Sequence, residues 1–281
     1  MDDLTIERGD LAVPQPDWPV DFVRWRPPPA LAGLVVDMTG YRELAAGPIH
    51  QVETASLVVP LIFSFADPFE IGLGRQPGRA DRMPSFIAGL FGGPVLINST
   101  GRAHCLQINF TPLGAHRFFG LPMREIADRM VPVADIDDPG VAELGARVEE
   151  AADWPTRFAL VEELVARRLG VATSLSGAGR AFARLLRSGG TARVEALAGE
   201  LDWSRKHLAS RFRDEIGLPP KAVARIVRFN RAQRLALGVD LVDWADIAVA
   251  AGYADQAHLV REFREFAGAS PAGWLARQPR A

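Results

Sequence analysis

The stretch Gly252-Tyr-Ala-Asp-Gln-Ala-His-Leu-Val-Arg-Glu-Phe-Arg-Glu-Phe-Ala-Gly-Ala-Ser-Pro271 decides what the second half of this chain is expected to be. Gly252 can supply the left-handed backbone of a tight turn, because it has no Cβ to clash. Asp255 suits the N-cap of a following helix. Leu259, Phe263 and Phe266 recur at helical spacing and give that helix a buried seam. The residues left outside the seam are Gln256, Ala257, His258, Arg261 and Arg264.

A second helix is expected directly before this stretch. Asp243 and Asp246 can cap it reciprocally. Its apolar positions are Ile247, Ala248 and Ala251. Two short helices joined by a glycine turn are typical of a helix-turn-helix, whose second helix enters the major groove of DNA.

The same plan occurs earlier in the chain. Thr191 can cap a helix whose buried positions are Val194, Leu197, Ala198 and Leu201. After the turn Leu201-Asp202-Trp203, Ser204 is an N-cap, and Leu208 and Phe212 form the seam of the next helix. The residues that point away from this seam are Arg205, Lys206, Ala209, Ser210 and Arg213. Basic side chains at a helix N-terminus suit phosphates and guanine edges.

A long helix from Pro219-Pro220 to about Leu237 is expected to connect the two units. Its buried positions are Val223, Ile226, Val227 and Leu235, and its basic row is Arg225, Arg228, Arg231 and Arg234. A row of arginines can meet phosphates or can form an ordinary solvated face. Trp203, Trp244 and Trp274 are interpreted as core anchors of their helices.

Residues about 185–279 resemble the DNA-binding domain of AraC/XylS-type regulators. The quoted stretch carries the likeness in the second unit. Ser204-Arg-Lys-His-Leu-Ala-Ser-Arg-Phe212 and Gly217-Leu-Pro-Pro-Lys221 carry it in the first. The resemblance implies that the two recognition helices enter successive major grooves on one face of double-stranded DNA.

The resemblance also implies which residues face the DNA. The implied base-facing residues are Lys206, Ala209 and Ser210 in the first unit and Gln256, Ala257, His258 and Arg261 in the second. Ser204 is the N-cap of the first recognition helix and is included in the DNA-binding set. The neighbouring candidates for phosphate contacts are Arg205, His207, Arg211 and Arg228. Ala209 and Ala257 can contact only a thymine methyl group, so one contact in each helix is expected to be weak.

Charge is divided unevenly along the 281 residues, whose net charge is -2. Residues 180–281 carry 17 basic and 11 acidic side chains, whereas residues 1–179 carry 15 and 23. A basic part joined to an acidic part is typical of a chain in which only one domain meets a polyanion.

The first half is predicted to be rich in short strands separated by turn residues. The apolar runs are Leu31–Val36, Ser56–Phe65, Phe69–Leu73, Ser85–Phe91, Pro94–Ile97 and His104–Phe110. Leu106, Ile108 and Phe110 alternate with Gln107 and Asn109, which is the period of a half-buried strand. Many short strands favour a barrel or a sandwich.

Helical segments are expected after this β-rich part. They cover Leu113–Phe119, Met123–Met130, Val141–Ala151 and Pro155–Leu169. Pro155 suits the first turn of its helix. Thr173-Ser-Leu-Ser-Gly-Ala-Gly179 is interpreted as a flexible linker.

Residues about 25–135 resemble, more loosely, the β-barrel N-terminal half of some AraC-type regulators. The run Asn109–Pro122 and the following Ile126–Val131 carry this likeness. It implies a domain that senses a small-molecule effector, of unknown identity, or that mediates pairing. A homodimer contact through residues 141–169 is one expectation, and packing of these helices on their own domain is the other.

An enzyme is the main alternative, as a metal- or substrate-binding β-barrel with an appended helical domain. Metal-binding barrels need clustered ligands, but His50, His104 and His116 stand far apart. Cys105 adjoins His104 on an expected strand, where successive side chains point to opposite faces, so a catalytic dyad is not predicted. We therefore expect no catalytic, metal or cofactor-binding residues and no enzyme activity. A third hypothesis is a ligand-binding module whose helical half no longer binds DNA.

The predicted fold class is α+β. A β-rich, barrel-like (cupin-like) domain spans residues 1–135, a helical connector and linker 136–179, and an all-α tandem helix-turn-helix domain 180–281. The predicted function is a sequence-specific transcription regulator, with RNA polymerase as a further partner if it activates. The chain begins Met1-Asp2-Asp3 without a basic-then-apolar leader. With a single cysteine and no expected membrane contact, a cytoplasmic location is predicted.

Overall fold

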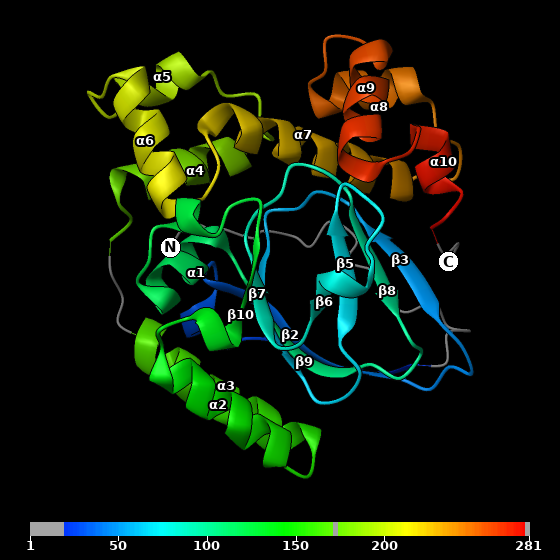
Figure 1. The fold of residues 1–281 in the computed structure, drawn as a ribbon. Helices are drawn as coiled ribbons and strands as arrows, with labels where there is room; N and C mark the ends of the chain where they lie inside the picture. Colours follow the sequence, from blue (N-terminus) through cyan, green and yellow to red (C-terminus); the bar gives the residue numbers. More distant parts are fainter. Residues whose placement is uncertain (1–19, 171–173, 279–281) are drawn as a thin grey trace.

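The structure is a computed structural model that describes residues 20–170 and 174–278. Two antiparallel sheets form the N-terminal part, and the C-terminal helices lie along one side of it (Figure 1). This is the α+β class that the sequence predicts, with the β-rich domain built from two open sheets. The opening residues and Thr173 lie outside the described residues, so the predictions on the leader and on the start of the linker fall outside them too.

The larger sheet has the order β1-β2-β9-β4-β7-β10, and the smaller has the order β3-β8-β5-β6. The strands of the larger sheet are β1 (Val20–Trp25), β2 (Val35–Glu43), β4 (Val59–Ser64), β7 (Phe86–Ala88), β9 (His104–Phe110) and β10 (Met130–Pro132). The strands of the smaller sheet are β3 (Ile49–Glu53), β5 (Phe69–Leu73), β6 (Arg82–Met83) and β8 (Val95–Ser99). The sequence predicts β5 and β9 with these bounds.

The central strand β9 is buried on both faces, whereas its alternation predicts a half-buried strand. Leu106, Ile108 and Phe110 belong to the main hydrophobic core, which includes the inner sides of the helices that follow the sheets. Gln107 and Asn109 face the other way, into the space between the two sheets. Asn109 is fully buried. The polar face of β9 therefore lines an interior space of the protein rather than its surface.

Three helices cover the outer face of the larger sheet (Figure 1). They are α1 (Pro112–Phe119), α2 (Pro139–Glu150) and α3 (Trp154–Leu169). Pro155 lies in the first turn of α3, as predicted. The buried positions Val141, Val148 and Val161 pack into the same core as the sheet. The apolar faces of α2 and α3 thus pack on their own domain, and a dimer contact through residues 141–169 stays a prediction.

The C-terminal part contains seven helices in the described residues. They are α4 (Gly177–Arg187), α5 (Val194–Gly199), α6 (Arg205–Glu215), α7 (Pro220–Leu237), α8 (Trp244–Ala251), α9 (Gln256–Ala267) and α10 (Pro271–Leu275). Trp203 and Trp244 pack half-buried against the core and Trp274 is buried in it, as expected for helix anchors.

Several local predictions are wrong, each for a physical reason. Residues 123–130 do not form a helix: Met123–Glu125 is one 3-10 turn, and the chain then pairs with β7 as β10. The stretch before β2 is a 3-10 turn at Pro29–Leu31, because two prolines precede it and β2 begins only at Val35. The linker ends earlier than expected, since the Ser176 side chain caps α4 and places Gly177 and Gly179 inside a helix.

Candidate DNA-binding surface and ligand cavity

The two helix-turn-helix units lie at opposite ends of α7 (Figure 1). The first consists of α5 and α6, and the second of α8 and α9. Gly252 is left-handed, with φ of 87°, as the turn between α8 and α9 requires. The first turn uses Asp202 instead, which has φ of 54°. Each unit keeps its second helix on the outside of the molecule.

The first recognition helix, α6, begins as predicted. The Ser204 hydroxyl accepts a hydrogen bond from the backbone N–H of His207 at 3.1 Å. Leu208 and Phe212 are fully buried, and the exposed set at the start of the helix is Arg205, Lys206, His207 and Ser210. Arg205 forms an exposed ion pair with Glu195 of α5 at 3.1 Å. The helix before it differs from prediction: Arg193, not Thr191, is the N-cap of α5, and the Thr191 hydroxyl donates to the carbonyl of Ser188.

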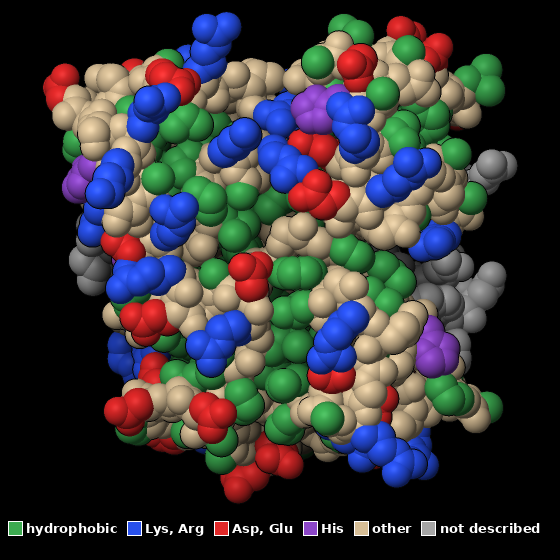
Figure 2. Space-filling model, turned by 45° about the horizontal axis from the view of Figure 1, so that its top comes forward, with side chains coloured by type: hydrophobic (Ala, Val, Ile, Leu, Met, Phe, Trp, Pro, Cys, Tyr) green, Lys and Arg blue, Asp and Glu red, His purple; other side chains and the backbone are tan. Residues whose placement is uncertain are grey.

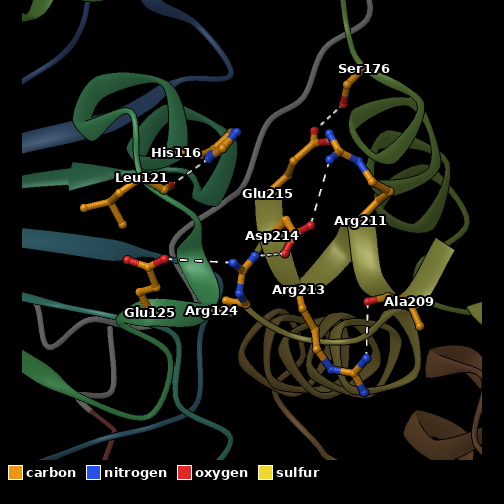
Figure 3. Close-up of polar contacts among 10 residues, drawn as sticks. All are labelled: His116, Leu121, Arg124, Glu125, Ser176, Ala209, Arg211, Arg213, Asp214 and Glu215. Atoms are coloured by element: carbon orange, nitrogen blue, oxygen red, sulfur yellow. Dashed lines mark hydrogen bonds and ion pairs between the residues drawn. The ribbon is translucent and has the colours of Figure 1, made fainter. Parts of the chain in front are cut away.

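The C-terminal end of α6 is fastened to other parts of the chain (Figure 3). Arg211, a candidate for a phosphate contact, donates to Glu215 at 2.7 Å, and Glu215 also accepts from Ser176. Asp214 pairs with Arg124, which belongs to the N-terminal part of the chain. Arg211 is thus engaged within the molecule, and the first unit presents its N-terminal half.

His207 packs against the turn that precedes its helix. Its ring lies edge-to-face on Trp203, with 4.5 Å between the ring centroids. The side chain is exposed on its other side. This placement favours packing as its main role.

The second recognition helix, α9, also begins as predicted. The Asp255 carboxylate accepts from the backbone N–H of His258 at 2.6 Å. Asp243 caps α8 by accepting from the N–H groups of Ala245 and Asp246. The seam residues Leu259, Phe263 and Phe266 are buried, and the exposed residues of α9 include Gln256, Ala257, Arg261, Arg264 and Glu265.

A buried carboxylate, Glu262, ties α9 to the linker helix α7. Glu262 is 2% exposed and accepts from Arg225 at 2.7 Å. Arg228 lies 3.7 Å from the same carboxylate oxygen and donates to the carbonyl of Gly190 at 2.9 Å. Arg225 also pairs with Glu265 at 3.0 Å. The first half of the basic row on α7 therefore holds the second unit in place.

Two residues that were predicted to contact DNA instead form contacts with this cluster. Arg228 was expected to meet phosphate, but its side chain is only 16% exposed and lies over the ring of Tyr253. His258 was expected to face bases, but its Nε2 lies 3.3 Å from Glu262, and its ring packs edge-to-face on Tyr253. Sequence reasoning missed Glu262, although its place four residues after His258 was a visible signal. Of the residues of α9 that were predicted to face bases, Gln256, Ala257 and Arg261 are exposed.

Basic side chains are spread over the face that carries both units (Figure 2). Acidic side chains lie among them, so the surface is not a uniform positive patch. Such a surface suits localised phosphate contacts around two reading helices.

A cavity of about 130 Å3 lies between the two sheets. Its wall is mainly apolar and includes Ile62, Phe69, Phe86 and Ile97. A group of polar side chains interrupts the wall: Thr39, Tyr41, Gln51, Glu53, Gln107 and Asn109. A mostly apolar cavity with a few convergent polar groups is the usual form of a small-molecule site. The sequence predicted a sensing domain but none of these residues.

One segment of the cavity wall also touches the helix-turn-helix domain. The carbonyl of Ala55 accepts from Asn230 of α7 at 2.9 Å, and its N–H donates to the carbonyl of Phe266 at 2.9 Å. Beside it, Thr54 accepts from Gln233 at 3.2 Å. Thr54 and Ala55 both line the cavity, so the cavity wall is in direct contact with the linker helix and the second unit.

His104 and Cys105 lie on opposite faces of β9, as the strand period predicts. His104 packs between the rings of Phe65 and Trp154. Cys105 lines the cavity wall, and burial raises the pKa of its thiol to about 12. In residues 20–170 and 174–278, no group of His, Cys, Asp and Glu is arranged to hold a metal ion. Within the same residues, no helix is both long and apolar enough to cross a membrane.

Comparisons with known proteins agree with this geometry in the C-terminal part. Residues 197–277 match the family described as "Helix-turn-helix domain", and residues 23–132 match "Domain of unknown function (DUF6597)". No curated protein matches the chain. The family match and the paired units define a DNA-binding transcription regulator. The C-terminal part of the chain therefore contains a domain of this helix-turn-helix family.

Solved structures with a similar course of the chain include ToxT from Vibrio cholerae, at 11% identity and a TM-score of 0.43, covering 82% of this chain and 98% of that one. A ToxT structure described as bound to an unsaturated fatty acid has 11% identity and a TM-score of 0.41, covering 83% and 96%. The AraC-like transcriptional activator CuxR has 13% identity and a TM-score of 0.24, covering 69% and 80%. No residue or ligand is carried over from them.

Proposed function

We propose that this chain is a sequence-specific regulator that binds double-stranded DNA through both helix-turn-helix units and responds to a small molecule bound in the N-terminal cavity. The observation that carries the first part is the pair of recognition helices, α6 and α9, whose N-terminal halves are both exposed at opposite ends of one linker helix. One unit contacts only one groove, whereas two linked units can select a longer site.

Base reading in this proposal depends mainly on α9. Gln256 can pair with adenine and Arg261 with guanine. Lys206 and Ser210 are the corresponding groups of α6, with Arg205 at the phosphates. His258, held by Glu262, sets the position of the helix rather than reading a base.

The effector response is supported by the contact between the cavity wall and α7. Thr54 and Ala55 line the cavity and also bond Gln233 and Asn230. A ligand that shifts this segment therefore acts directly on the linker helix. Control further requires that the ligand bind more tightly to one position of this segment than to another.

The test is to recover the genomic fragments that the purified protein binds, and then to measure Kd for one such duplex and its scrambled version at increasing salt. We expect a preference of roughly a thousandfold or more for the recovered site. We also expect log Kd to rise linearly with log salt concentration, because bound phosphates release counterions. Equal affinity for both duplexes would contradict the proposal.

A further inference from the structure

The charge of the cavity wall limits the kind of molecule that can bind there. Among the described residues that line the cavity, no Lys, Arg or His is present, and Glu53 is the one charged side chain. A carboxylate brought into such a site would lose its hydration without gaining a cation, which is costly. The cavity therefore disfavours anionic ligands.

One hydrogen-bond relay leads from the sheet edge into the cavity. Arg24 donates to Asp37 at 2.8 Å, and Asn109 donates its amide to the other Asp37 oxygen at 2.6 Å. Gln107 then donates its amide to the Asn109 carbonyl oxygen at 2.7 Å. Because a carboxylate can only accept, Asp37 fixes the direction of both amides. Gln107 consequently keeps its carbonyl oxygen as an acceptor and one amide hydrogen as a donor, because a primary amide carries two hydrogens.

A second relay has the same direction. The Glu43 carboxylate is buried and accepts from Tyr41 at 3.0 Å, from Ser99 at 2.7 Å and from the N–H of Ala103 at 2.9 Å. Gln51 donates to the Tyr41 hydroxyl at 3.2 Å. Burial, and then the Glu43 charge, raise the pKa of Tyr41, so its hydroxyl keeps the proton that it donates. Gln51, like Gln107, keeps its carbonyl oxygen as an acceptor and one amide hydrogen as a donor.

The two relays are built differently but have the same result. Each ends in a buried carboxylate, starts at a glutamine of the cavity wall, and leaves that glutamine as an acceptor. The carboxylates themselves are satisfied by other donors, Arg24 for Asp37 and Ser99 with Ala103 for Glu43. Buried polar chains of this kind are costly unless fully paired, and a ligand donor would pair the remaining ends.

The volume of the cavity limits ligand size. A volume of about 130 Å3 is close to the ~150 Å3 of a cavity that holds benzene. It is well below the roughly 300–1,000 Å3 of pockets for drug-sized ligands. One ring, or a chain of similar volume, fills it.

We propose that the cavity binds a small, mostly apolar molecule that carries no negative charge, through a hydroxyl or N–H donor that points to the carbonyl oxygens of Gln107 and Gln51. The proposal rests on the effector role argued above and specifies the chemistry of the effector. The apolar wall holds the ring. A hydroxyl can donate to a glutamine carbonyl oxygen and accept from a free amide hydrogen, whereas a molecule that can only accept leaves both carbonyl oxygens without a donor.

The test uses three probes of similar size, titrated into the full chain without DNA and followed by calorimetry and ligand-observed NMR. Phenol is neutral and donates, anisole is neutral and only accepts, and benzoate is anionic. We expect phenol to bind about tenfold more tightly than anisole, the size expected for one net hydrogen bond. Benzoate is expected to bind more weakly than phenol as well. Equal or tighter binding of anisole or benzoate, or no binding of phenol at millimolar concentration, would overturn the proposal.

Two variants locate the acceptors. Gln107→Met and Gln51→Met keep the side-chain length and remove one acceptor each, and the preference for phenol over anisole should fall to about twofold in at least one of them. Gln76→Met is the matched control, because Gln76 is exposed and outside the cavity wall, and it should keep the full preference. An undiminished preference in both folded cavity variants would contradict the assignment.

Failure of this ligand proposal can be distinguished from failure of the proposed DNA-binding function. Protein that prefers phenol but binds every duplex equally leaves the ligand chemistry standing and removes the sequence-specific role. Protein that selects its DNA site but prefers benzoate overturns the ligand chemistry alone.

Discussion

The two recognition helices begin in the same way and are fastened in different ways. Each starts with a side-chain cap, Ser204 in α6 and Asp255 in α9. The end of α6 is held by Arg124 of the N-terminal domain and by Ser176 before α4. The middle of α9 is held through Glu262 by Arg225 of the linker helix. Side-chain contacts therefore fix the first unit to the N-terminal domain and the second unit to the linker helix, where α9 also receives one backbone hydrogen bond from Ala55 of the N-terminal domain.

The contacts that hold the two recognition helices therefore differ in strength, although the two units look alike in the sequence. The exposed ion pair of Arg124 and Asp214 can be lost at little cost, because the attraction between exposed charges is weak. The contact of Glu262 is buried and cannot be lost without leaving charges unpaired. We therefore expect α9 to keep its position and α6 to be the mobile partner when the N-terminal domain moves.

The largest expected effect follows from removal of the buried carboxylate. Glu262→Ala leaves Arg228, at 16% exposure, without its carboxylate partner and takes one of two partners from Arg225. We expect the free energy of unfolding to fall by about 2–4 kcal/mol, since breaking a buried ion pair costs more than a surface one. Urea denaturation followed by circular dichroism measures it.

The matched control is Glu265→Ala. Glu265 binds the same arginine but is exposed, so its removal should cost less than about 1 kcal/mol. If both variants lost the same stability, the buried contact would not be what holds α9 on α7.

The second effect concerns base reading and compares the two units directly. Arg261→Ala should weaken binding to the selected duplex by about 1–3 kcal/mol, and binding to a scrambled duplex much less. Lys206→Ala in α6 should cost less sequence preference, because the lysine ammonium is a flexible point charge without the planar fork of donors that arginine offers to guanine. Fluorescence anisotropy with both duplexes measures each change.

Arg264→Ala provides the control on the same helix. Arg264 is exposed one turn further from the N-terminus of α9, so its loss should affect both duplexes alike. A larger loss of preference from Lys206→Ala than from Arg261→Ala would reverse the assignment of the two units.

Local rules predicted the helical half of the fold well. The caps Ser204 and Asp255, the left-handed Gly252 and the seams of α6 and α9 depend on neighbours within one or two turns. The β-rich half was harder, because strand pairing joins distant residues. Strand β2 was missed in most of its length because its inward residues, among them Asp37, Thr39 and Glu43, are polar and buried. An apolar pattern cannot reveal a polar interior.

The candidate site was also predictable only where local rules decide it. Exposure of Lys206, Gln256 and Arg261 follows from helical periodicity. The covering of Arg228 and the contact of His258 with Glu262 do not, because both depend on Glu262, which meets α7 only after the domain folds. Likewise, the direction of Gln107 depends on Asp37, far away in the sequence. Contacts between elements decided both cases.

The smallest expected effect is on the contact between α6 and the N-terminal domain. Asp214→Ala removes the ion pair with Arg124, whose side chain is half exposed, so the free energy of unfolding should change by less than about 1 kcal/mol. Hydrogen exchange should nevertheless become faster at Met123–Glu125 and at the end of α6, because local opening there loses one of its restraints. Exchange in α9 should stay unchanged, since Glu262 holds it from another side. Arg213→Ala is the control, because Arg213 donates to the carbonyl of Ala209 in its own helix (Figure 3), and it should leave Met123–Glu125 unaffected. Equal acceleration in α9 would mean that the two units share one restraint, and the distinction between them would fail.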